Sequence, residues 1–271
     1  MTTSPLRPLK RYGQNFLVDQ NIIRKILSAL EVDRRDHILE IGPGRGSLTF
    51  HLIKIVRRLT AVEIDRGLAR RLQDQASGRL DVIQGDFLRF GLKAYARRHK
   101  VRSFVVVANI PYYITTPILE KLFEHACLLR DIYVMVQKEV AERMRAPVGS
   151  KAYSAFTCFV NYFCEPRVLF RVSPGSFVPA PRVDSCFVRL TLKSGSDRDR
   201  GLKSEDLLFK VIRAAFGQRR KKLRSSLAGL LSGERLSLLA EVADLDRRAE
   251  ELSLDEFKRI ANLVFDILGK G

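Results

Sequence analysis

Short apolar runs of strand length alternate with longer amphipathic stretches through the first half of this 271-residue chain. The amphipathic stretches carry apolar residues at helical spacing. Asp19 is expected to cap the first of them, and Thr116 to cap a later one that has Pro117 in its first turn. Strands separated by helices predict a doubly wound, mainly parallel sheet with its ligand crevice at the carboxyl ends of the strands. The expected strands are residues 37–41, 59–64, 80–83, 104–108 and 132–136.

The second half of the chain changes character twice. After a loop and a helix come two strand-like runs, residues 167–172 and 186–192. Residues 193–201 have the composition of a linker, and everything after them has helical patterning. We therefore predict an α/β domain over residues 1–193, a linker over 194–204 and a small all-helical domain over 205–271.

The chain is strongly basic, with 48 Lys and Arg against 30 Asp and Glu and a net charge of +18. This balance favours a polyanionic partner such as nucleic acid. Residues 1–200 hold 34 basic and 19 acidic residues, whereas 201–271 hold 14 and 11. The nucleic-acid surface is therefore predicted on the large domain and on one basic helix of the tail. The candidate RNA-binding residues on that helix are Arg219, Arg220, Lys221 and Lys222.

Several classes of protein are disfavoured by the composition. No run approaches the ~18 apolar residues of a membrane span, and residues 1–8 lack the apolar core of a signal peptide, so a cytoplasmic location is expected. The four cysteines form no Cys-x-x-Cys pair and have no histidine at ligand spacing. We expect reduced, mostly buried thiols rather than disulfides, and no metal site. They are Cys127, Cys158, Cys164 and Cys186.

The tetrapeptide Asn109-Ile110-Pro111-Tyr112 directly follows the apolar run 104–108. Methylation of an exocyclic amino group, whose lone pair is delocalised, needs hydrogen-bond acceptors facing the N–H bonds and a ring that stacks on the flat substrate. The Asn109 side-chain oxygen and the carbonyl of Ile110 or Pro111 are candidate acceptors. Pro111 stiffens the turn, and Tyr112 is the candidate ring. A plain strand-ending turn is the alternative interpretation.

Three strand ends together indicate a cofactor site. The turn at residues 42–46 has glycines at Gly-x-Gly-x-Gly spacing, unlike the Gly-x-Gly-x-x-Gly of dinucleotide sites, and Gly42 and Gly44 let a ligand approach the backbone. Glu63 ends the second strand, where a carboxylate can accept from ribose hydroxyls. Asp86 follows the third strand, where it can accept from an adenine amino group. Each acid alone could be a solvated loop residue, but together they favour S-adenosylmethionine over NAD.

The chain resembles, over nearly its whole length, the small-subunit ribosomal RNA adenine N6,N6-dimethyltransferases of the KsgA type. Arg45 and Ser47 occupy variable positions of the glycine turn, and Tyr113 stands where the family often has Asn. No functional position departs from the family pattern. The matching segments are Gln14-Asn-Phe-Leu17, Glu40-Ile-Gly-Pro-Gly-Arg-Gly46, Glu63-Ile-Asp65, Gly85-Asp86, Asn109-Ile-Pro-Tyr112, Phe177-Val-Pro-Ala-Pro-Arg-Val-Asp-Ser185 and Phe216-Gly-Gln-Arg-Arg-Lys-Lys-Leu223.

This resemblance implies a Rossmann-like S-adenosylmethionine-dependent methyltransferase sheet with a small C-terminal helical domain. The implied reaction dimethylates N6 of two adjacent adenines in a hairpin loop of 16S rRNA, within a 30S subunit or its precursor, by a monomer. The implied cofactor site comprises Asn15, Leu17, Gly42, Gly44, Glu63, Asp86 and Asn109. The implied catalytic residues around the adenine are Asn109, Pro111, Tyr112 and Phe177.

Three other functions fit parts of the sequence. The Erm-type large-subunit RNA methyltransferases share the cofactor motifs and the Asn-Ile-Pro-Tyr tetrapeptide. The stretch 179–185 and the long helical tail nevertheless favour the small-subunit enzymes. A mainly non-catalytic role in ribosome assembly is compatible with every motif. An NAD oxidoreductase is disfavoured by the glycine spacing and by the net charge.

Overall fold

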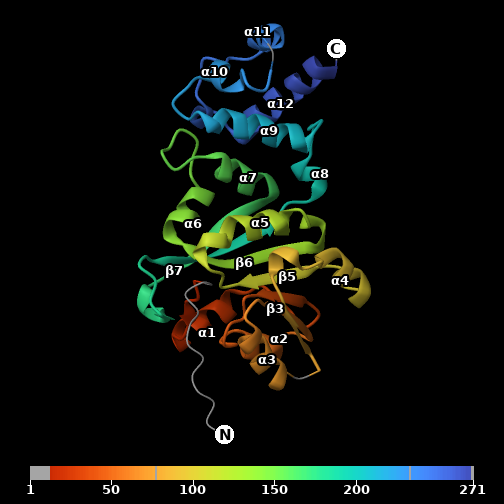
Figure 1. Cartoon of the computed structure of the whole chain (residues 1–271), viewed down its shortest axis with the longest axis vertical. Helices are drawn as coiled ribbons and strands as arrows, with labels where there is room; N and C mark the ends of the chain where they lie inside the picture. Colours follow the sequence, from red (N-terminus) through yellow and green to blue (C-terminus); the bar gives the residue numbers. More distant parts are fainter. Residues whose placement is uncertain (1–12, 77, 232, 270–271) are drawn as a thin grey trace. The chain divides into compact units, whose positions relative to one another are not determined.

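The computed structural model describes residues 13–76, 78–231 and 233–269, and the expectation about a targeting signal, which rests on residues 1–8, lies outside these ranges. The chain divides into two compact units (Figure 1). The first contains the residues up to Ala141 together with Pro166–Leu192, and the second contains Glu142–Glu165 and the residues from Lys193 onward.

A seven-stranded sheet forms the centre of the first unit, in the order β4-β3-β2-β5-β6-β9-β7. From β4 to β6 each neighbouring pair is parallel, and β9 runs antiparallel to β6. The predicted doubly wound sheet is therefore confirmed. The strands are β2 (His37–Ile41), β3 (Arg58–Glu63), β4 (Leu80–Gln84), β5 (Phe104–Ala108), β6 (Leu129–Gln137), β7 (Cys164–Val172) and β9 (Ser185–Leu192).

Helices cover both faces of this sheet. The helices α1 (Gln20–Ala29), α2 (Thr49–Ile55) and α3 (Arg66–Asp74) lie on one side, and α4 (Leu92–His99) and α5 (Thr115–Phe123) lie on the other (Figure 1). The α1–α3 side packs on inward-facing strand residues in one apolar cluster, and burial of each aliphatic side chain there contributes about 1.5–3 kcal/mol. Members of this cluster include Ile23, Ile26, Ile38, Leu52, Leu59, Leu72 and Val105.

The first predicted helix cap is confirmed and the second is wrong. Asp19 caps α1, because its Oδ1 accepts a hydrogen bond of 2.8 Å from the Asn21 N–H. Helix α5 begins at Thr115, so Thr116 lies inside it rather than at its cap. The short 3-10 turn η3 (Tyr112–Ile114) leads straight into α5, and the Thr115 N–H bonds to the carbonyl of Tyr112. That backbone bond supplies what a side-chain cap would otherwise provide.

Two further short strands bring the N-terminal segment against the middle of the chain. Strand β1 (Phe16–Leu17) pairs antiparallel with β8 (Phe177–Val178), and Leu17 stands opposite Phe177. In the ranges that the structure describes, four short 3-10 turns lie in the connections besides η3. They are η2 (Phe87–Arg89), η4 (Ala126–Leu128), η5 (Pro174–Ser176) and η6 (Ala249–Glu251).

The second unit is helical, as expected from the tail, but it also takes in residues 142–165. Helix α7 (Ala155–Phe163) packs on α9 (Glu205–Gly217) through aromatic rings. Phe163 stacks on Phe209 with ring centroids 5.9 Å apart, and Tyr162 contacts the Phe209 ring edge-on with centroids 5.2 Å apart. The division therefore differs from the expected domain boundaries in this segment. The remaining helices are α6 (Lys138–Met144), α7 (Ala155–Phe163), α8 (Gly195–Arg198), α9 (Glu205–Gly217), α10 (Leu223–Leu227), α11 (Gly233–Val242) and α12 (Leu254–Gly269).

The structure places the four cysteines as free thiols. All four cysteines are free, and Cys127 alone is exposed. Burial raises the pKa of Cys158 to about 11, so this thiol is protonated at neutral pH. In the described part of the chain no helix has the length and apolar character to cross a membrane.

A polar network under the start of the sheet predicts acid sensitivity. His37 Nε2 lies 2.7 Å from Thr60 Oγ1, and burial, aided by the nearby charges of Arg58 and His99, lowers the pKa of His37 from 6.5 to about 4. On acidification, His37 therefore becomes protonated in the unfolded chain at a higher pH than in the folded chain. The free energy of unfolding should fall as the pH drops from about 6.5 towards 4, by up to ~1.4 kcal/mol per pH unit.

This expectation is tested by urea unfolding at pH 7 and pH 5, with His37→Gln as the matched variant. The free energy of unfolding of the wild-type protein should lose more on acidification than that of His37→Gln. An equal loss in both proteins would assign the acid sensitivity to other groups.

Candidate active site

Four neighbouring strands present the candidate site residues at one edge of the sheet. In spatial order they are Asp86 after β4, Glu63 at the end of β3, Gly42 after β2 and Asn109 after β5. Strands β3 and β4 are added on one side of β2, and β5 and β6 on its other side. This change in strand order between β2 and β5 opens a crevice at their carboxyl ends. One pocket joins all four of these residues, and Asn15, Leu17 and Tyr112 also line it.

The glycine turn brings bare backbone to this pocket. Gly42 and Gly44 have φ of +67° and +58°, values that L side chains rarely adopt. A Cβ on Gly44 would lie 3.0 Å from ring atoms of Phe16. The guanidinium of Arg45 lies over that same ring, 4.6 Å from its centroid. The turn thus places a glycine and an aromatic wall together beside the pocket.

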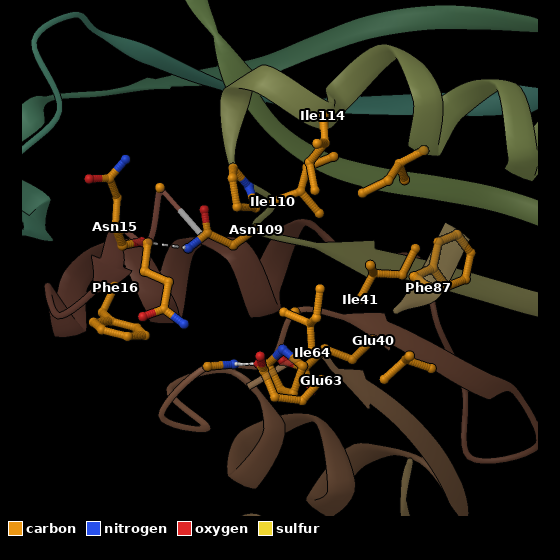
Figure 2. Close-up of a pocket in the computed structure, with 18 of the residues that line it drawn as sticks. Asn15, Phe16, Glu40, Ile41, Glu63, Ile64, Phe87, Asn109, Ile110 and Ile114 are labelled. Atoms are coloured by element: carbon orange, nitrogen blue, oxygen red, sulfur yellow. Dashed lines mark hydrogen bonds between the residues drawn. The ribbon is translucent and has the colours of Figure 1, made fainter. Parts of the chain in front are cut away.

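Glu63 is buried and held by the backbone. Its Oε2 accepts from the Gly44 N–H at 2.9 Å (Figure 2). Its Oε1 accepts from the Asp65 N–H, also at 2.9 Å. Burial raises the pKa of Glu63, and these backbone hydrogen bonds oppose the rise. Each carboxylate oxygen has further acceptor capacity, so the fixed carboxylate can also accept from ligand hydroxyls.

Two more carboxyl groups line the pocket. Glu40, which the sequence reasoning did not assign to the site, is 3% exposed, and its Oε2 has no hydrogen-bond partner among the described residues. Burial raises its pKa to about 8. Its position two residues before Gly42 was the only signal that could have found it. Asp86 is half-buried, and its Oδ1 accepts from the Leu88 N–H at 2.9 Å.

Asn109 is oriented by the N-terminal segment. Its Nδ2 donates to the backbone carbonyl of Asn15 at 3.2 Å, as Figure 2 shows. Because a carbonyl accepts only from the amide nitrogen, this bond fixes which way round the Asn109 amide stands. Its oxygen is thereby left as an acceptor for another partner.

The residues after Asn109 form a stiff rim. Pro111 has φ of −58°, and its carbonyl accepts from the Ile114 N–H at 3.2 Å. The hydroxyl of Tyr112 lies 2.5 Å from Ser185 Oγ, which anchors the half-buried Tyr112 ring at the pocket. Tyr113, also in the lining, is 64% exposed. The structure therefore brings Asn109, Pro111 and Tyr112 together at one site.

Phe177 is placed differently. Its side chain is 2% exposed and belongs to the apolar cluster under the sheet, and it is not among the residues that line the pocket. Its strand β8 nevertheless pairs with β1, whose Phe16 and Leu17 do line the pocket. Phe177 thus stands one strand away from the site in this conformation.

The basic residues of the tail do not lie on a helix. Helix α9 ends at Gly217 and α10 begins at Leu223, so residues 219–222 form the turn between them, and the helix prediction is wrong. Gly217 and the bridge between Lys222 and Arg248 end the helical repeat there. Two of the four cations are paired: Arg219 lies 2.9 Å from Glu250, and Lys222 lies 3.4 Å from Asp246.

The residues of the pocket fit S-adenosylmethionine. This cofactor has two positive charges, a ribose and an adenine. Glu63 and Asp86 supply carboxylate acceptors, and the orphaned oxygen of Glu40 is a buried polar atom that a ligand can satisfy. Among the described residues no group of three or more acidic, His or Cys side chains could hold a metal ion. The fold and this site define an S-adenosylmethionine-dependent methyltransferase with a Rossmann-like sheet.

The comparisons with known proteins agree with this class. The model of the family described as ribosomal RNA adenine dimethylase matches residues 7–266. The chain belongs to this family, and it is an rRNA adenine dimethyltransferase that uses S-adenosylmethionine.

Two relatives are named ribosomal RNA small subunit methyltransferase A. The one from Clostridioides difficile is 41% identical over 94% of this chain and 90% of its own length. The one from Pseudoalteromonas translucida is also 41% identical, over 96% of each chain.

Solved structures show the same fold. A dimethyladenosine transferase from Plasmodium falciparum superposes with a TM-score of 0.76 at 28% identity, covering 93% of this chain and 98% of the other. The 23S rRNA methyltransferase ErmE superposes with a TM-score of 0.66 at 24% identity, covering 93% and 100%. The second similarity concerns the fold alone.

Proposed function

We propose that this enzyme dimethylates N6 of two adjacent adenines in a hairpin loop of small-subunit (16S) rRNA, within a 30S subunit or its precursor. The observation that carries this proposal is the pocket in which Asn109, Pro111 and Tyr112 face the three carboxyl groups. Relatives at 37–41% identity are named for the small subunit, whereas the 23S enzyme is similar at 24%. This difference favours the small subunit over the Erm-type alternative.

Asn109 is assigned the role of positioning the amine. With its Nδ2 held by Asn15, the Asn109 oxygen can accept one N6–H of adenine. The carbonyl of Pro111 already accepts from Ile114, so the carbonyl of Ile110 is the better candidate for the second N–H. Two acceptors restrict the amine to one orientation and turn its nitrogen lone pair towards the methyl donor.

The aromatic rim is assigned the role of holding the base. Extrusion of an adenine from its RNA stack costs a few kcal/mol, and less from a loop. Stacking on Tyr112, whose hydroxyl is fixed by Ser185, can offset about 1–3 kcal/mol of that cost. Phe177 can serve as the second face only if its side chain leaves the core, so we assign the first contact to Tyr112.

S-adenosylmethionine supplies the methyl group on a sulfonium, an intrinsically good leaving group. The protein therefore has to orient and desolvate the amine more than it has to remove a proton. The residues assigned to hold this cofactor are those of the pocket edge, in agreement with the chemistry of each group. They are Asn15, Leu17, Gly42, Gly44, Glu63, Asp86 and Asn109.

We also propose that the enzyme acts as a monomer in the cytoplasm. One chain supplies every residue of the pocket, which supports a monomer. An rRNA substrate supports a cytoplasmic location. A role in ribosome assembly that does not need methylation can coexist with this activity, because binding and catalysis use different residues.

The proposal is tested by incubating the protein with labelled S-adenosylmethionine and undermethylated 30S particles, then mapping the label. We expect label on two adjacent adenines of 16S rRNA, as dimethyladenosine. Label on 23S rRNA in a parallel incubation with 50S particles, and none on 30S, would replace the small-subunit substrate by the Erm-type one.

The turn at residues 219–222 is proposed to bind RNA phosphates. Arg220 and Lys221 are exposed and form no ion pair in the described chain, whereas Arg219 and Lys222 have acidic partners that RNA must displace. Replacing Arg220 and Lys221 by Gln should therefore flatten the plot of log affinity against log salt by roughly 1–2 units.

The matched control replaces Arg219 and Lys222 by Gln, which removes the same charge. It should change the salt slope less, because those two cations are already neutralised in the free protein. Calorimetry with free S-adenosylmethionine should give wild-type affinity for both variants. A wild-type slope for the Arg220 and Lys221 variant would show that RNA is held elsewhere.

A further inference from the structure

The starts of the parallel strands carry an unusual density of positive charge. The segments that lead into β2, β3, β4 and β5, together with the first residue of β3, contain nine exposed cations, which we call the strand-start surface. These four strands are neighbours in the sheet, so their starting segments lie side by side. The strand-start surface consists of Arg34, Arg35, Arg57, Arg58, Arg79, Arg97, Arg98, Lys100 and Arg102.

None of these nine cations forms an ion pair within the described chain. The acids of the same segments are engaged otherwise. Asp36 pairs with Arg130 at 2.7 Å, and Asp81 accepts from the Tyr95 hydroxyl at 2.6 Å. Asp33 accepts from the Arg35 backbone N–H at 2.6 Å. The nine cations outnumber the acids of these segments, so this edge keeps a net positive charge.

Local structure accounts for only part of this charge. Arg97 and Arg98 lie in the last turn of α4, where cations interact favourably with the helix dipole. The arginines at 34, 35, 57, 79 and 102 lie outside any helix, so a helix dipole does not explain their positive charge. Like charges gathered on neighbouring strand starts repel one another, so a structural role does not explain them.

A hollow lies within this surface. Arg58, Arg79 and His99 line it, and its other polar lining residues are His37, Thr60, Asp81 and Tyr95. A chain of hydrogen bonds fixes its floor, because the Tyr95 hydroxyl donates to Asp81 and lies 2.8 Å from Thr60 Oγ1. The rings of Tyr95 and His99 stack at 4.2 Å. The hollow thus gives the surrounding cations a rigid base, and the Asp81 carboxylate in its floor leaves phosphate contacts to the exposed arginines around it.

We propose that the strand-start surface binds the phosphate backbone of rRNA, at a segment distinct from the one that enters the active site. Four adjacent strands span about 14 Å, the length of about four nucleotides of a duplex strand. Strands of five or six residues separate this edge from the pocket edge by about 17 Å or more. A target loop in the pocket therefore leaves this surface to other RNA. The inference rests on an rRNA substrate.

The test compares two variants of equal charge. The surface variant carries Arg35→Gln, Arg57→Gln, Arg79→Gln and Arg98→Gln, one change before each of the four strands. The control carries Arg24→Gln, Arg70→Gln, Arg71→Gln and Lys93→Gln, four exposed cations on α1, α3 and α4 that lie outside the surface. The affinity of each for undermethylated 30S particles and for isolated 16S rRNA is measured against salt concentration.

For the surface variant we expect the slope of log affinity against log salt to be about 2–3.5 units less steep, on both the particle and the isolated rRNA. The control should stay within about one unit of the wild-type slope. Methylation of a short hairpin fragment at saturating concentration should be unchanged in both variants, which separates this result from any failure of the small-subunit assignment.

Three results would overturn the proposal. The first is a wild-type salt slope for the surface variant. The second is an equal decrease of the slope in both variants, which would reflect net charge alone. The third is a decrease of the slope with 30S particles but none with isolated rRNA. The last result would identify an acidic ribosomal protein as the partner. Melting temperatures within a few degrees of wild type verify that both variants are folded.

Discussion

Asn109→Ala should lower kcat for methyl transfer by about 100-fold or more, while the affinity for 30S particles stays close to wild type. The reason is that Asn109 orients one amine, and loss of orientation alone can cost a factor of that size. We propose that RNA phosphates contact other residues, so binding should be largely preserved. Single-turnover methylation and particle binding, measured on the same preparation, check both parts.

Asn109→Asp sharpens this test. A carboxylate keeps an acceptor for the adenine N–H, but it cannot donate to the Asn15 carbonyl, and the two oxygens would repel each other. We therefore expect Asn109→Asp to be strongly impaired as well. A nearly active Asn109→Asp would show that the bond to Asn15 does not set the orientation. A parallel fall in particle affinity and activity for Asn109→Ala would refute the division of roles.

Glu63→Ala should weaken S-adenosylmethionine binding by about 1–3 kcal/mol, a factor of roughly 5–150, because the ribose hydroxyls would lose a charged acceptor. Calorimetry with the free cofactor measures this directly. The substitution also leaves the N–H groups of Gly44 and Asp65 without their acceptor, so thermal unfolding must accompany it. Unchanged cofactor affinity in a folded variant would remove Glu63 from the site.

The pH dependence of cofactor binding gives a second measure of Glu63. Burial raises its pKa, so the carboxylate becomes protonated at a higher pH than an exposed glutamate does. Because the ionised form is the acceptor, affinity should fall as the pH is lowered from neutral. Glu63→Ala should lack that part of the fall. Asp86→Ala is the matched comparison, since it removes a pocket carboxylate and leaves Glu63 in place.

Strand periodicity was enough to predict most of the sheet. The runs at 37–41 and 104–108 coincide with β2 and β5, because buried parallel strands are continuous apolar segments with sharp ends. The strand ends also identified Gly42, Glu63, Asp86 and Asn109, since parallel strands bring their carboxyl ends to one edge. These predictions depend only on local pattern and on a rule of topology.

Other features depended on contacts between distant residues. The basic stretch 219–222 forms a turn after α9 ends at Gly217, and Arg219 forms an ion pair with Glu250. No local sequence pattern shows that ion pair. Residues 142–165 pack with the tail because Phe163 and Phe209, 46 positions apart in sequence, stack on each other. Glu40 lies in the matching glycine motif, but only its burial in the structure revealed the unpartnered oxygen at the pocket.

The sequence by itself determined the class of this enzyme, because the groups proposed to bind cofactor and amine lie in short motifs at strand ends. Tertiary structure alone decided the orientation of Asn109, which depends on a bond to Asn15, 94 residues away. It also decided that Phe177 rests in the core and that separate arginines gather at the strand starts. The physical reason is that burial and charge density are sums over neighbours in space, and the order of the strands sets those neighbours.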